Sequence, residues 1–539
     1  MGESCAVGID LGTTNSVVSI WRHGRVETIP IRGFNKTPSV VSFDDDGILV
    51  GEEAKSRLDV FPETTVGSVK RFMGDRTKTP YEINGQKYTP VDISALILKK
   101  LVEGASEYLG EPVKRAVISV PAYFNEDQKE DTKLAAEQAG LEVMRLVAEP
   151  TAAALAYGFR QKKDQLLLVY DLGGGTFDVS ILKVEGDDFR VIAVDGDARL
   201  GGDDFDEAIM KHLSTVFADK TGKDITGQSS RLGRIALQKL KEQAEKAKIK
   251  LALFQEAEIK IPDLLGVPFI EKLTRPKFVD LIQPFLNKTV QKVDSVLKSA
   301  KLKPDQIDRV ILVGGSTRIP AIKDILKQKI GDPYTADNVD EIVAAGAAIF
   351  AYWDDPDHPG IDDRPALPRD VTAHALGIEM LKDDFSGVFF QPLIDKNTEY
   401  PCKGGVTGFS VTPYQKSVLM KVYRESLAGE NCKGDLSLPI TVRREPVPAM
   451  AVFDLDRNGI IHFTAVEMLV SEGAQENLRR SLARKEAKNK VAEMERSLQS
   501  YFETQARQGR VSDFEPLDRF IKDGWVRAEE VRINPGIKS

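Results

Sequence analysis

The chain has 539 residues, and its 74 Lys and Arg stand against 82 Asp and Glu, which gives a formal net charge of −8 at pH 7. Nucleic acids and anionic membrane surfaces bind stripes of positive charge, so this acidic balance argues against both as partners. Hydrophobic residues at 42% and charged residues at 29% are typical of a soluble chain with a folded core. The length suggests about three or four folding units.

The cysteines and the apolar stretches indicate the compartment. Cys5, Cys402 and Cys432 are too few and too scattered for a disulfide framework or a zinc site. The first residues lack the basic and apolar regions of a signal peptide. The longest uncharged apolar stretch, residues 342–353, is shorter than the roughly 20 residues that cross a bilayer. We therefore expect a cytoplasmic protein.

An internal repeat is the most informative feature of the first half of the chain. Residues 7–20 read VGIDLGTTNSVVSI, and residues 168–182 read LVYDLGGGTFDVSIL. In each copy an apolar run ends in Asp, passes through Gly and Thr, and continues into a β-branched run, which predicts a β-hairpin with an acid at its turn. Because the copies lie about one domain apart, we expect a duplicated α/β architecture with a cleft between its halves.

The segments around these hairpins extend the α/β pattern to about Trp353. Helices are expected at 126–139, 235–250 and 277–299, and short apolar runs lie at 116–120 and 309–313. Residues 354–370 are rich in Asp and Pro, which are poor in helices and central strands. This stretch predicts a domain boundary.

The pattern changes after the boundary. Short alternating segments interrupted by turns predict an antiparallel β domain, with strands at 387–394, 409–412, 418–423, 449–454 and 460–466. After residue 471 the apolar spacing predicts an amphipathic helix or helix pair that Gly509 ends. The tail to Ser539 has no strong pattern.

Three glycine-rich turns carry the chemistry. Glycine lets backbone N–H groups approach a polyphosphate, and threonine hydroxyls add donors. The first two turns follow Asp10 and Asp171 and comprise Gly12, Thr13, Thr14, Gly173, Gly174, Gly175 and Thr176. The two aspartates suit Mg²⁺, which takes one or two carboxylates together with phosphate oxygens. A third turn, residues 314–318, is placed to receive a nucleoside. One such turn alone is more often simple turn chemistry, but three in this order predict a nucleotide site.

The sequence resembles the seventy-kilodalton heat-shock chaperones, the DnaK-like family. Three stretches carry the resemblance: IDLGTTNS at 9–16, DLGGGTFDVSIL at 171–182 and ILVGGSTRIP at 311–320. Between them lie VISVPAYF at 117–124, AEPTAAALAYG at 148–158 and LGGDDFD at 200–206. Sugar kinases and actins share the hairpins but not these intervening strings. The match runs from about residue 6 to about residue 471.

The resemblance implies a multidomain fold and a known kind of activity. The expected parts are an actin-like duplicated α/β ATPase domain at 1–365, a linker at 366–370, an antiparallel β-sandwich for peptides at 371–471, a short helical lid at 472–508 and a tail at 509–539. The implied activity is that of an ATP-dependent chaperone that hydrolyses ATP to ADP with Mg²⁺. The implied partners are unfolded or client polypeptides, a J-domain co-chaperone and a nucleotide-exchange factor.

The resemblance also implies roles for residues of the ATPase domain. Asp10 and Asp171 would hold the metal, and Lys70 would orient the attacking water or neutralise charge on the γ-phosphate. Glu149 and Asp178 would stand behind the metal and the water, while the glycines and threonines of the first two turns, Thr176 included, would contact phosphates. The implied nucleoside contacts are Glu245, Lys248, Gly314, Gly315, Ser316, Arg318 and Asp340.

Without the resemblance, these residues have plainer interpretations. Lys70 would be a solvated surface lysine, Glu149 an acid at a helix N-terminus, and Glu245 with Lys248 a charged helix face. Ala252 stands where many family members place a serine that bonds the adenine. Losing one such bond costs about 0.5–1.5 kcal/mol, so nucleotide binding should survive.

The peptide-binding residues implied by the resemblance are Phe390, Phe409, Val418 and Met420. Strand alternation puts Val418, Met420 and Val422 on one face, and Phe389 is a further candidate for the pocket wall. The alternative is that all six belong to the sandwich core. Two departures from the family leave a second hypothesis open. In the linker stretch Ala366 to Asp370 only Leu367 is a large aliphatic, and the lid is short. These features suit an adaptor with a weakly coupled ATPase. A third hypothesis, a sugar kinase on the actin fold, gives no role to the β domain.

Overall fold

The computed structural model describes residues 5–467, apart from 76, 159–163, 187, 226–229, 336–337, 356–368, 383–385, 411–413, 429–431, 441, 443 and 445–446. At 407, 409, 434, 448 and 466 only the backbone is described. The chain divides into two compact units, Met1–Asp370 and Val371–Ser539. The expected lid at 472–508 and tail at 509–539 lie outside the described residues.

The first unit contains two lobes, and the first lobe is built on a mixed sheet. Its strands follow the order β11-β10-β1-β2-β3, with β4 paired to β2. These are β1 (Cys5–Asp10), β2 (Asn15–Arg22), β3 (Arg25–Thr28), β4 (Thr37–Pro38), β10 (Val113–Val120) and β11 (Glu142–Ala148). β1 and β2 form an antiparallel hairpin, while β1, β10 and β11 run parallel. The hairpin predicted at 7–20 is therefore confirmed.

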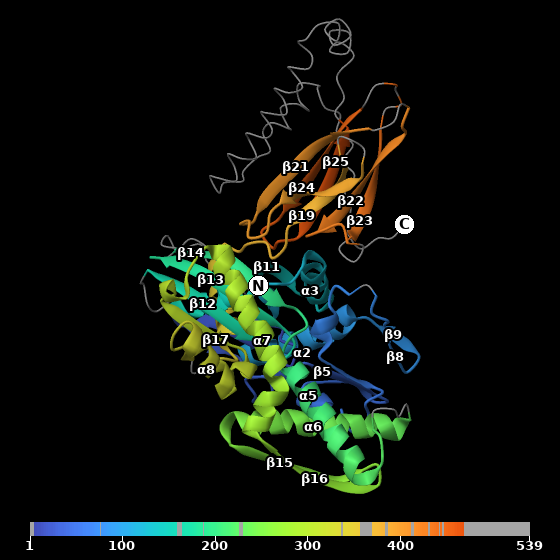
Figure 1. The fold of residues 1–539 in the computed structure, drawn as a ribbon, viewed down its shortest axis with the longest axis vertical. Helices are drawn as coiled ribbons and strands as arrows, with labels where there is room; N and C mark the ends of the chain where they lie inside the picture. The colour runs from blue at the N-terminus through green and yellow to red at the C-terminus, as the bar shows by residue number, and fades with distance from the viewer. Residues whose placement is uncertain are drawn as a thin grey trace, which may run out of the picture. The chain divides into compact units, whose positions relative to one another are not determined.

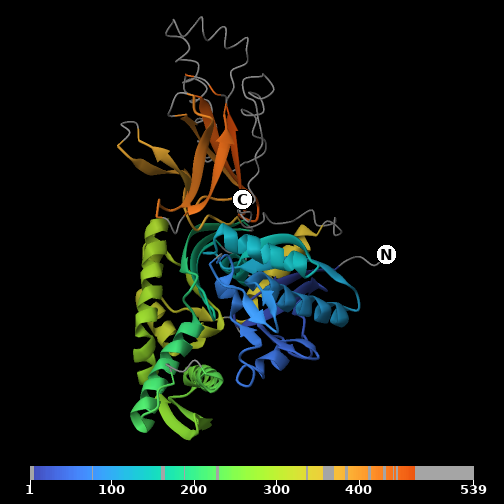
Figure 2. The same cartoon turned by 90° about the vertical axis from the view of Figure 1, so that its right-hand side faces the viewer.

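The second lobe repeats this arrangement. Its sheet has the order β14-β13-β12-β17-β18, from β12 (Gln165–Leu172), β13 (Phe177–Glu185), β14 (Asp188–Asp197), β17 (Arg309–Val313) and β18 (Tyr334–Thr335). β12 and β13 form the second predicted hairpin, with Asp171 opposite Asp178, and β17 lies parallel to β12. Figure 2 shows the two lobes side by side, with the first in blue and the second in green and yellow.

Helices cover both sheets and carry residues of the cleft. The first lobe has α2 (Pro90–Leu109) and α3 (Glu126–Gln138), which begin at the capping boxes of Thr89 and Asn125. The second lobe has α5 (Gly202–Thr221), α6 (Arg231–Leu253), α7 (Arg275–Ala300) and α8 (Pro320–Lys329). A hairpin of β15 (Glu256–Leu264) and β16 (Val267–Thr274) lies against α6, as Figure 1 shows. The three helices expected from the sequence correspond to α3, α6 and α7.

Small elements complete the cleft. The first lobe adds β5 (Val40–Asp44), β6 (Gly47–Val50), α1 (Glu52–Lys55), β7 (Thr65–Gly67), η1 (Val69–Phe72), β8 (Tyr81–Ile83) and β9 (Gln86–Tyr88). The second lobe adds η2 (Pro304–Gln306) and η3 (Gly315–Arg318). Of these, η1 and η3 contribute side chains to the site described below.

Two Ala-rich helices cross where the lobes meet. α9 (Ile342–Asp354) packs on β1 and β2, and α4 (Glu149–Gly158) packs on β12 and β13. A Cβ added at Gly346 would overlap the backbone of Ala152 in α4, and one added at Gly8 would overlap the backbone of α9. No side chain fits at either point, so the backbones of these elements are in direct contact.

The end of the first unit is held on the second lobe. Of the expected linker 366–370, only Arg369 and Asp370 are described. Arg369 pairs with β14: Val191 N donates to Arg369 O over 3.2 Å, and Arg369 N donates to Phe189 O over 3.3 Å. Asp370 accepts a hydrogen bond from Thr151 Oγ1 over 2.5 Å, at the start of α4. Burial raises the pKa of Asp370.

The second unit is a pair of antiparallel sheets. One has the order β20-β19-β22-β23 and the other β21-β24-β25. The strands are β19 (Leu376–Leu381), β20 (Val388–Ile394), β21 (Cys402–Phe409), β22 (Ser417–Arg424), β23 (Cys432–Pro439), β24 (Pro448–Leu455) and β25 (Ile461–Glu467). Apolar side chains of both sheets share one core, with Phe453 and Leu438 among its most buried members. This arrangement is a β-sandwich.

Four of the five strands expected in this unit are confirmed. β20, β22, β24 and β25 correspond to the runs expected from the sequence. Of the strand expected at 409–412, Phe409 ends β21, which begins at Cys402, and residues 411–412 lie outside the described residues. The sequence of β21, CKGGVTGF, has glycines where an apolar alternation would signal a strand. Among the described residues, no helix is both long and apolar enough to cross a membrane.

Candidate functional site

A cavity of about 380 Å³ lies between the lobes of the first unit, at the ends of β1, β12 and β17. Most of the residues expected at a nucleotide site line it. They are Asp10, Gly12, Thr13, Thr14, Lys70, Glu149, Asp171, Gly173, Gly174, Thr176, Glu245, Lys248, Gly314, Gly315, Ser316, Arg318 and Asp340. Gly175 and Asp178 lie outside the lining. A neighbouring cavity of about 640 Å³ shares Thr13, Thr14, Glu245 and Lys248.

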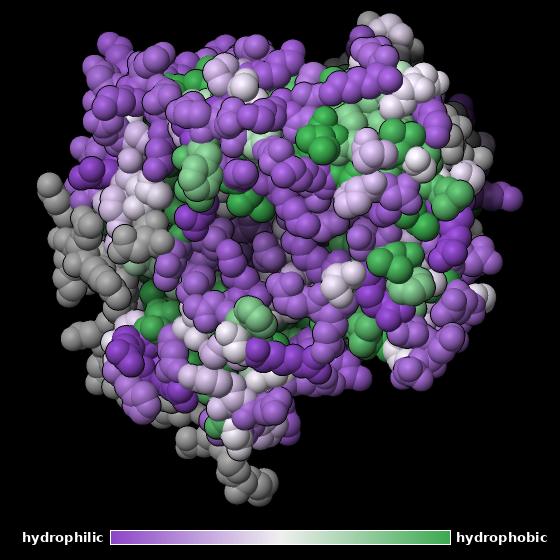
Figure 3. Space-filling view, turned by 90° about the horizontal axis from the view of Figure 1, so that it is seen from below, coloured by the Kyte–Doolittle hydropathy of each residue, from purple (hydrophilic) through white to green (hydrophobic). Residues whose placement is uncertain are grey.

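The two hairpin turns face each other across this space. A Cβ added at Gly174 would overlap the Thr14 side chain, and one added at Gly175 would lie 2.7 Å from both Thr13 and Arg71 side-chain atoms. The turns are therefore in contact, and their backbone amides can approach one ligand from two sides. The space-filling view shows a hollow near the middle of a largely hydrophilic face (Figure 3).

Lys70 is buried beside the acidic residues. Its Nζ donates to Glu149 Oε1 over 2.6 Å, and only 4% of its side chain is exposed. Burial alone would lower the pKa of Lys70, but the carboxylates of Glu149 and Asp10 outweigh burial and raise it. Lys70 is therefore a fixed positive charge. The interpretation of Lys70 as a surface lysine, which its sequence context alone favoured, is wrong.

Three aspartates share this buried region with Glu149. Burial, reinforced by repulsion from Glu149, raises the pKa of Asp10 to about 6 and that of Asp178 to about 8. The same causes raise the pKa of Asp171 well above its ordinary value. Ser119 Oγ donates to Asp10 Oδ1 over 2.8 Å, and Tyr123 N donates to Asp178 Oδ1 over 2.7 Å.

This excess of buried negative charge fits a divalent cation. Four carboxylates stand against Lys70, and a cation would relieve the repulsion that raises their pKa values. Asp10 and Asp171 line the cavity and would hold Mg²⁺. Within the described residues, no group of three or more His, Cys, Asp or Glu is arranged to hold a metal. Mg²⁺ does not need a group of that size, because it takes one or two carboxylates and completes its shell with waters and phosphate oxygens.

The end of the cavity near α6 has a different set of polar contacts. Lys248 Nζ donates to Asp206 Oδ2 over 2.6 Å and to Gly202 O over 3.0 Å. Glu245 pairs with Lys55 of the first lobe over 3.2 Å. These pairs fix the charged side chains of α6 against α5 and against α1.

A second set of polar contacts lies at η3, where Arg318 and Lys36 both bond Asp340. Arg318 Nη2 and Lys36 Nζ both donate to Asp340 Oδ2, over 2.9 and 3.1 Å. Burial opposes ionisation of Asp340, but the charges of Lys36 and Arg318 prevail and lower its pKa. Ser316 Oγ donates to Gly173 O over 2.9 Å, which ties the third glycine-rich turn to the second.

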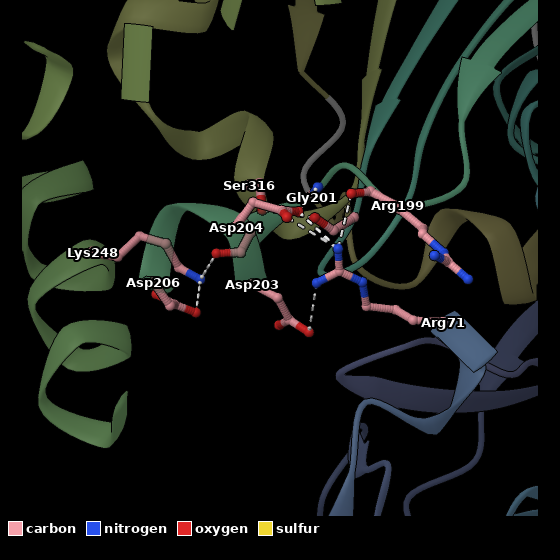
Figure 4. A network of polar contacts seen from close by, with 10 residues as sticks. Arg71, Arg199, Gly201, Asp203, Asp204, Asp206, Lys248 and Ser316 are labelled. Atoms are coloured by element: carbon pink, nitrogen blue, oxygen red, sulfur yellow. Dashed lines mark hydrogen bonds and ion pairs between the residues drawn. The ribbon is translucent and has the colours of Figure 1, made fainter. Parts of the chain in front are cut away.

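Arg71, beside Lys70 in η1, reaches from the first lobe to the second. Its Nη2 donates to Asp204 Oδ1 over 3.0 Å and to Arg199 O over 2.9 Å, and its Nη1 lies 3.8 Å from Asp203 Oδ2 (Figure 4). Sequence reasoning did not find this residue. The adjacent acids in LGGDDFD were the available signal, but their partner lies more than a hundred positions away in the chain.

The residues expected at the peptide site lie in the second unit. Met420 is buried in the sandwich core, and Val418 packs against that core. Phe390 is half-buried on β20, over Gly377. The Phe409 side chain lies outside the described residues. Large exposed side chains on these strands are Val388, Phe389 and Leu419. The placement of Met420 agrees with the core alternative considered for it.

The fold and the site together define a class of protein. Two lobes with matching hairpin sheets, facing glycine-rich turns and buried acids form an actin-like nucleotide-binding unit, and a β-sandwich follows it. A protein-family model described as Hsp70 protein matches residues 6–522. The chain therefore belongs to the Hsp70 family. Proteins of this family are in general ATP-dependent chaperones that bind ATP or ADP with Mg²⁺.

Proposed function

We propose that this chain is an ATPase chaperone that binds and releases extended hydrophobic segments of unfolded or client polypeptides, and that ATP hydrolysis drives the exchange. The buried Lys70–Glu149 pair, set among Asp10, Asp171 and Asp178 between two facing hairpins, carries the proposal. Such a group of charges is costly to bury. It suits the transfer of a phosphoryl group to water.

The residues of the site divide the work of that reaction. Phosphoryl transfer depends mainly on positioning and on stabilising negative charge. Bound Mg²⁺, held by Asp10 and Asp171, would neutralise charge on the phosphate oxygens. Lys70 stays protonated and supplies a second positive charge. Its Nζ is held in place by the 2.6 Å hydrogen bond that it donates to Glu149. The amides and hydroxyls of the turns, from Thr13 to Thr176, would bind phosphate oxygens.

The polar pairs around the nucleoside hold the other end of the ligand. Glu245 and Lys248 lie at the ribose side in this proposal, and Arg318 with Asp340 lies at the base side. Asp178 has a positioning role in this proposal. It accepts a hydrogen bond from the Tyr123 backbone N–H and so holds the start of β13 against the loop after β10. The site would thus be complete within the first unit.

The β-sandwich would bind the peptide. An extended peptide can pair with strand edges and place its side chains in apolar pockets. Phe390 and Val418, which are only partly buried, are the proposed peptide contacts on the described strands. Met420 is buried in the core. The proposed partners are client polypeptides, a J-domain co-chaperone and a nucleotide-exchange factor, and the proposed compartment is the cytoplasm.

ATP turnover by the full chain tests this proposal. It is measured alone, with an unfolded peptide, and with the peptide and a J-domain protein together. We expect slow basal hydrolysis that both additions accelerate. Turnover that neither addition changes, with hydrolysis intact, would contradict the coupling of the two units but not the ATPase.

An adaptor with a weakly coupled ATPase is the second candidate. The linker sequence favours it, because Pro368 lacks a backbone donor and Leu367 is its only large aliphatic residue. Peptide dissociation rates measured with ATP and with ADP separate the candidates. Equal rates favour the adaptor, whereas faster release with ATP favours the coupled chaperone.

A further inference from the structure

The larger cavity of the first unit, of about 640 Å³, lies beside the nucleotide cavity and is lined by both lobes. The first lobe contributes residues between β5 and β8, and the second lobe contributes α5 and α6. The function proposed above uses only the four residues that the two cavities share. The remaining lining therefore has no role in binding the nucleotide.

Carboxylates outnumber lysines on this lining. The described residues that line the cavity include seven Asp and Glu but only four Lys, and neither Arg nor His. A concave surface with an excess of one sign of charge concentrates ions of the opposite sign. The cavity therefore favours a cationic ligand. Its acids are Asp59, Glu63 and Glu82 from the first lobe and Asp203, Asp206, Glu242 and Glu245 from the second.

Asp206 lines this cavity with one carboxylate oxygen uncommitted. Only 3% of the residue is exposed. Its Oδ2 accepts a hydrogen bond from Lys248 Nζ over 2.6 Å, whereas its Oδ1 accepts none from any residue that the structure describes. Figure 4 shows Asp206 on α5 beside Asp203, with Lys248 reaching toward it from α6. A buried oxygen without a donor is unfavourable, so a donor supplied by a ligand would stabilise it.

The charges around Asp206 are not balanced by its pair with Lys248. Burial raises the pKa of Asp206 to about 6 although Lys248 opposes the rise, and Glu245 and Asp203 reinforce it. Glu245 is itself paired with Lys55 over 3.2 Å. A further positive group beside Asp206 would relieve the remaining repulsion.

The arrangement of the acids suits an organic cation better than a metal ion. Without phosphate oxygens, a metal would need several protein ligands at one point, and among the described residues no group of three or more His, Cys, Asp or Glu is so arranged. The acids lie instead on separate elements: Asp59 follows α1, Glu82 is on β8 and Asp206 is on α5. Leu58 and Ile83 add apolar surface to the same lining. A flexible chain of methylenes with several positive groups can contact separated acids and cover such surface.

We propose that this cavity binds a linear aliphatic polyamine, with one ammonium group at Asp206 and the others at carboxylates of the first lobe. Such a ligand touches both lobes, as the Lys55–Glu245 pair does, and so it holds them together. The inference goes beyond the proposed function, because binding of the polyamine requires neither ATP nor its hydrolysis.

Equilibrium dialysis of the full chain against radiolabelled spermidine tests the proposal. Mg²⁺ is present and nucleotide is left out, because the phosphates of a nucleotide bind polyamines themselves. We expect saturable binding with a dissociation constant below about 1 mM, and at least about tenfold weaker binding of butylamine, which carries a single ammonium group. Binding that does not saturate, or equal affinity for butylamine, would overturn the proposal.

Two variants locate the bound polyamine. Asp206→Asn should weaken spermidine binding by about ten- to hundredfold, because a buried carboxylate that accepts from an ammonium group is lost. Glu82→Gln should weaken it by about two- to fivefold, since this acid is exposed and its change leaves the core intact. The matched control is Glu103→Gln, which removes the same charge from an exposed position of α2 outside both cavities.

The pattern of losses decides the outcome. Losses in Asp206→Asn and Glu82→Gln, with none in Glu103→Gln, support binding in this cavity. Equal losses in Glu82→Gln and Glu103→Gln would reduce the effect to attraction by the net charge and would overturn the proposal. A loss in Asp171→Asn, with none in Glu82→Gln, would place the polyamine among the acids of the nucleotide cavity and would overturn it too.

Discussion

At the hairpin end of the nucleotide cavity, carboxylates and Lys70 are buried at a high electrostatic cost, whereas at the α6 end Ile249 and Leu253 are aliphatic and exposed. Buried charges recognise a ligand by where its charge lies, so the hairpin end suits the metal and the triphosphate of the proposed function. Exposed aliphatic groups select only for apolar area. The comparison teaches that, under the proposed function, the reaction depends on the buried charges at the hairpin end.

The strongest way to sharpen this contrast is to remove Lys70. We expect Lys70→Ala to slow hydrolysis by about 10²- to 10³-fold, because the variant loses the fixed positive charge that the proposed function assigns to the reacting phosphate. Nucleotide affinity should change by less than about tenfold. Single-turnover phosphate release and calorimetric titration measure the two effects, and Lys99→Ala, at an exposed lysine of α2, is the control. Equal loss of binding and hydrolysis would contradict the role assigned to Lys70.

Asp171 allows a test with two effects of opposite sign. We expect Asp171→Asn to weaken Mg-nucleotide binding by on the order of 100-fold, because a carboxylate oxygen leaves the metal site. The same change should stabilise the metal-free protein, because burial and the neighbouring carboxylates raise the pKa of Asp171 and make its charge unfavourable. Urea unfolding in EDTA measures the second effect. Asp219→Asn, exposed on α5, should change neither quantity.

The pH dependence of stability tests the buried charge directly. The pKa of Asp178 is raised from 3.8 to about 8, first by burial and then by Glu149. The folded state therefore binds this proton more tightly than the unfolded state, and the resulting stability is lost as pH rises through about 8. In metal-free protein we expect the free energy of unfolding to fall between about pH 4 and pH 8.

Asp178→Asn is the matching variant. Because asparagine does not titrate, the slope of stability against pH in this window should become shallower. Denaturant unfolding at several pH values in EDTA gives the slopes. An unchanged slope in the variant would show that other groups carry the dependence.

The smallest effect is expected at Arg71, which joins the lobes outside the two ends of the cavity. Ion pairs that are partly exposed contribute about 0–1 kcal/mol, so Arg71→Ala should speed nucleotide dissociation by about two- to fivefold. Stopped-flow release of a fluorescent ADP measures this rate. Arg309→Ala, exposed at the start of β17, is the control. Slower release in Arg71→Ala would show that the contact does not hold the cleft closed.

The sequence was sufficient for the hairpins and for the acids at their turns. Asp10 and Asp171 end apolar runs and precede glycines, and this local signal needs no knowledge of distant residues. The burial of Lys70 could not be read from the sequence, since its neighbours in VKRFMG are those of a surface turn. Only its contact with Glu149, far away in the chain, makes Lys70 part of the site. Arg71 was missed for the same reason.

The β-sandwich was harder to predict in detail. β20 and β24 have the apolar content of strands, but β21 and β23 contain glycine, lysine and serine and were not expected at their true positions. Alternation placed Val418 and Met420 on one face correctly, yet it could not tell whether that face meets a peptide or the opposite sheet. The packing of Met420 in the core depends on the second sheet, which a single strand does not reveal.

The crossing of α4 and α9 has a mechanical consequence. Backbone contact at Gly346 fixes the spacing of the two helices, while their alanines leave few long side chains to interlock. Because α4 packs on one sheet and α9 on the other, the crossing fixes how far apart the two sheets lie at this point. One added methyl group at Gly346 would overlap the Ala152 backbone and would therefore force the two helices, and the sheets that they cover, apart.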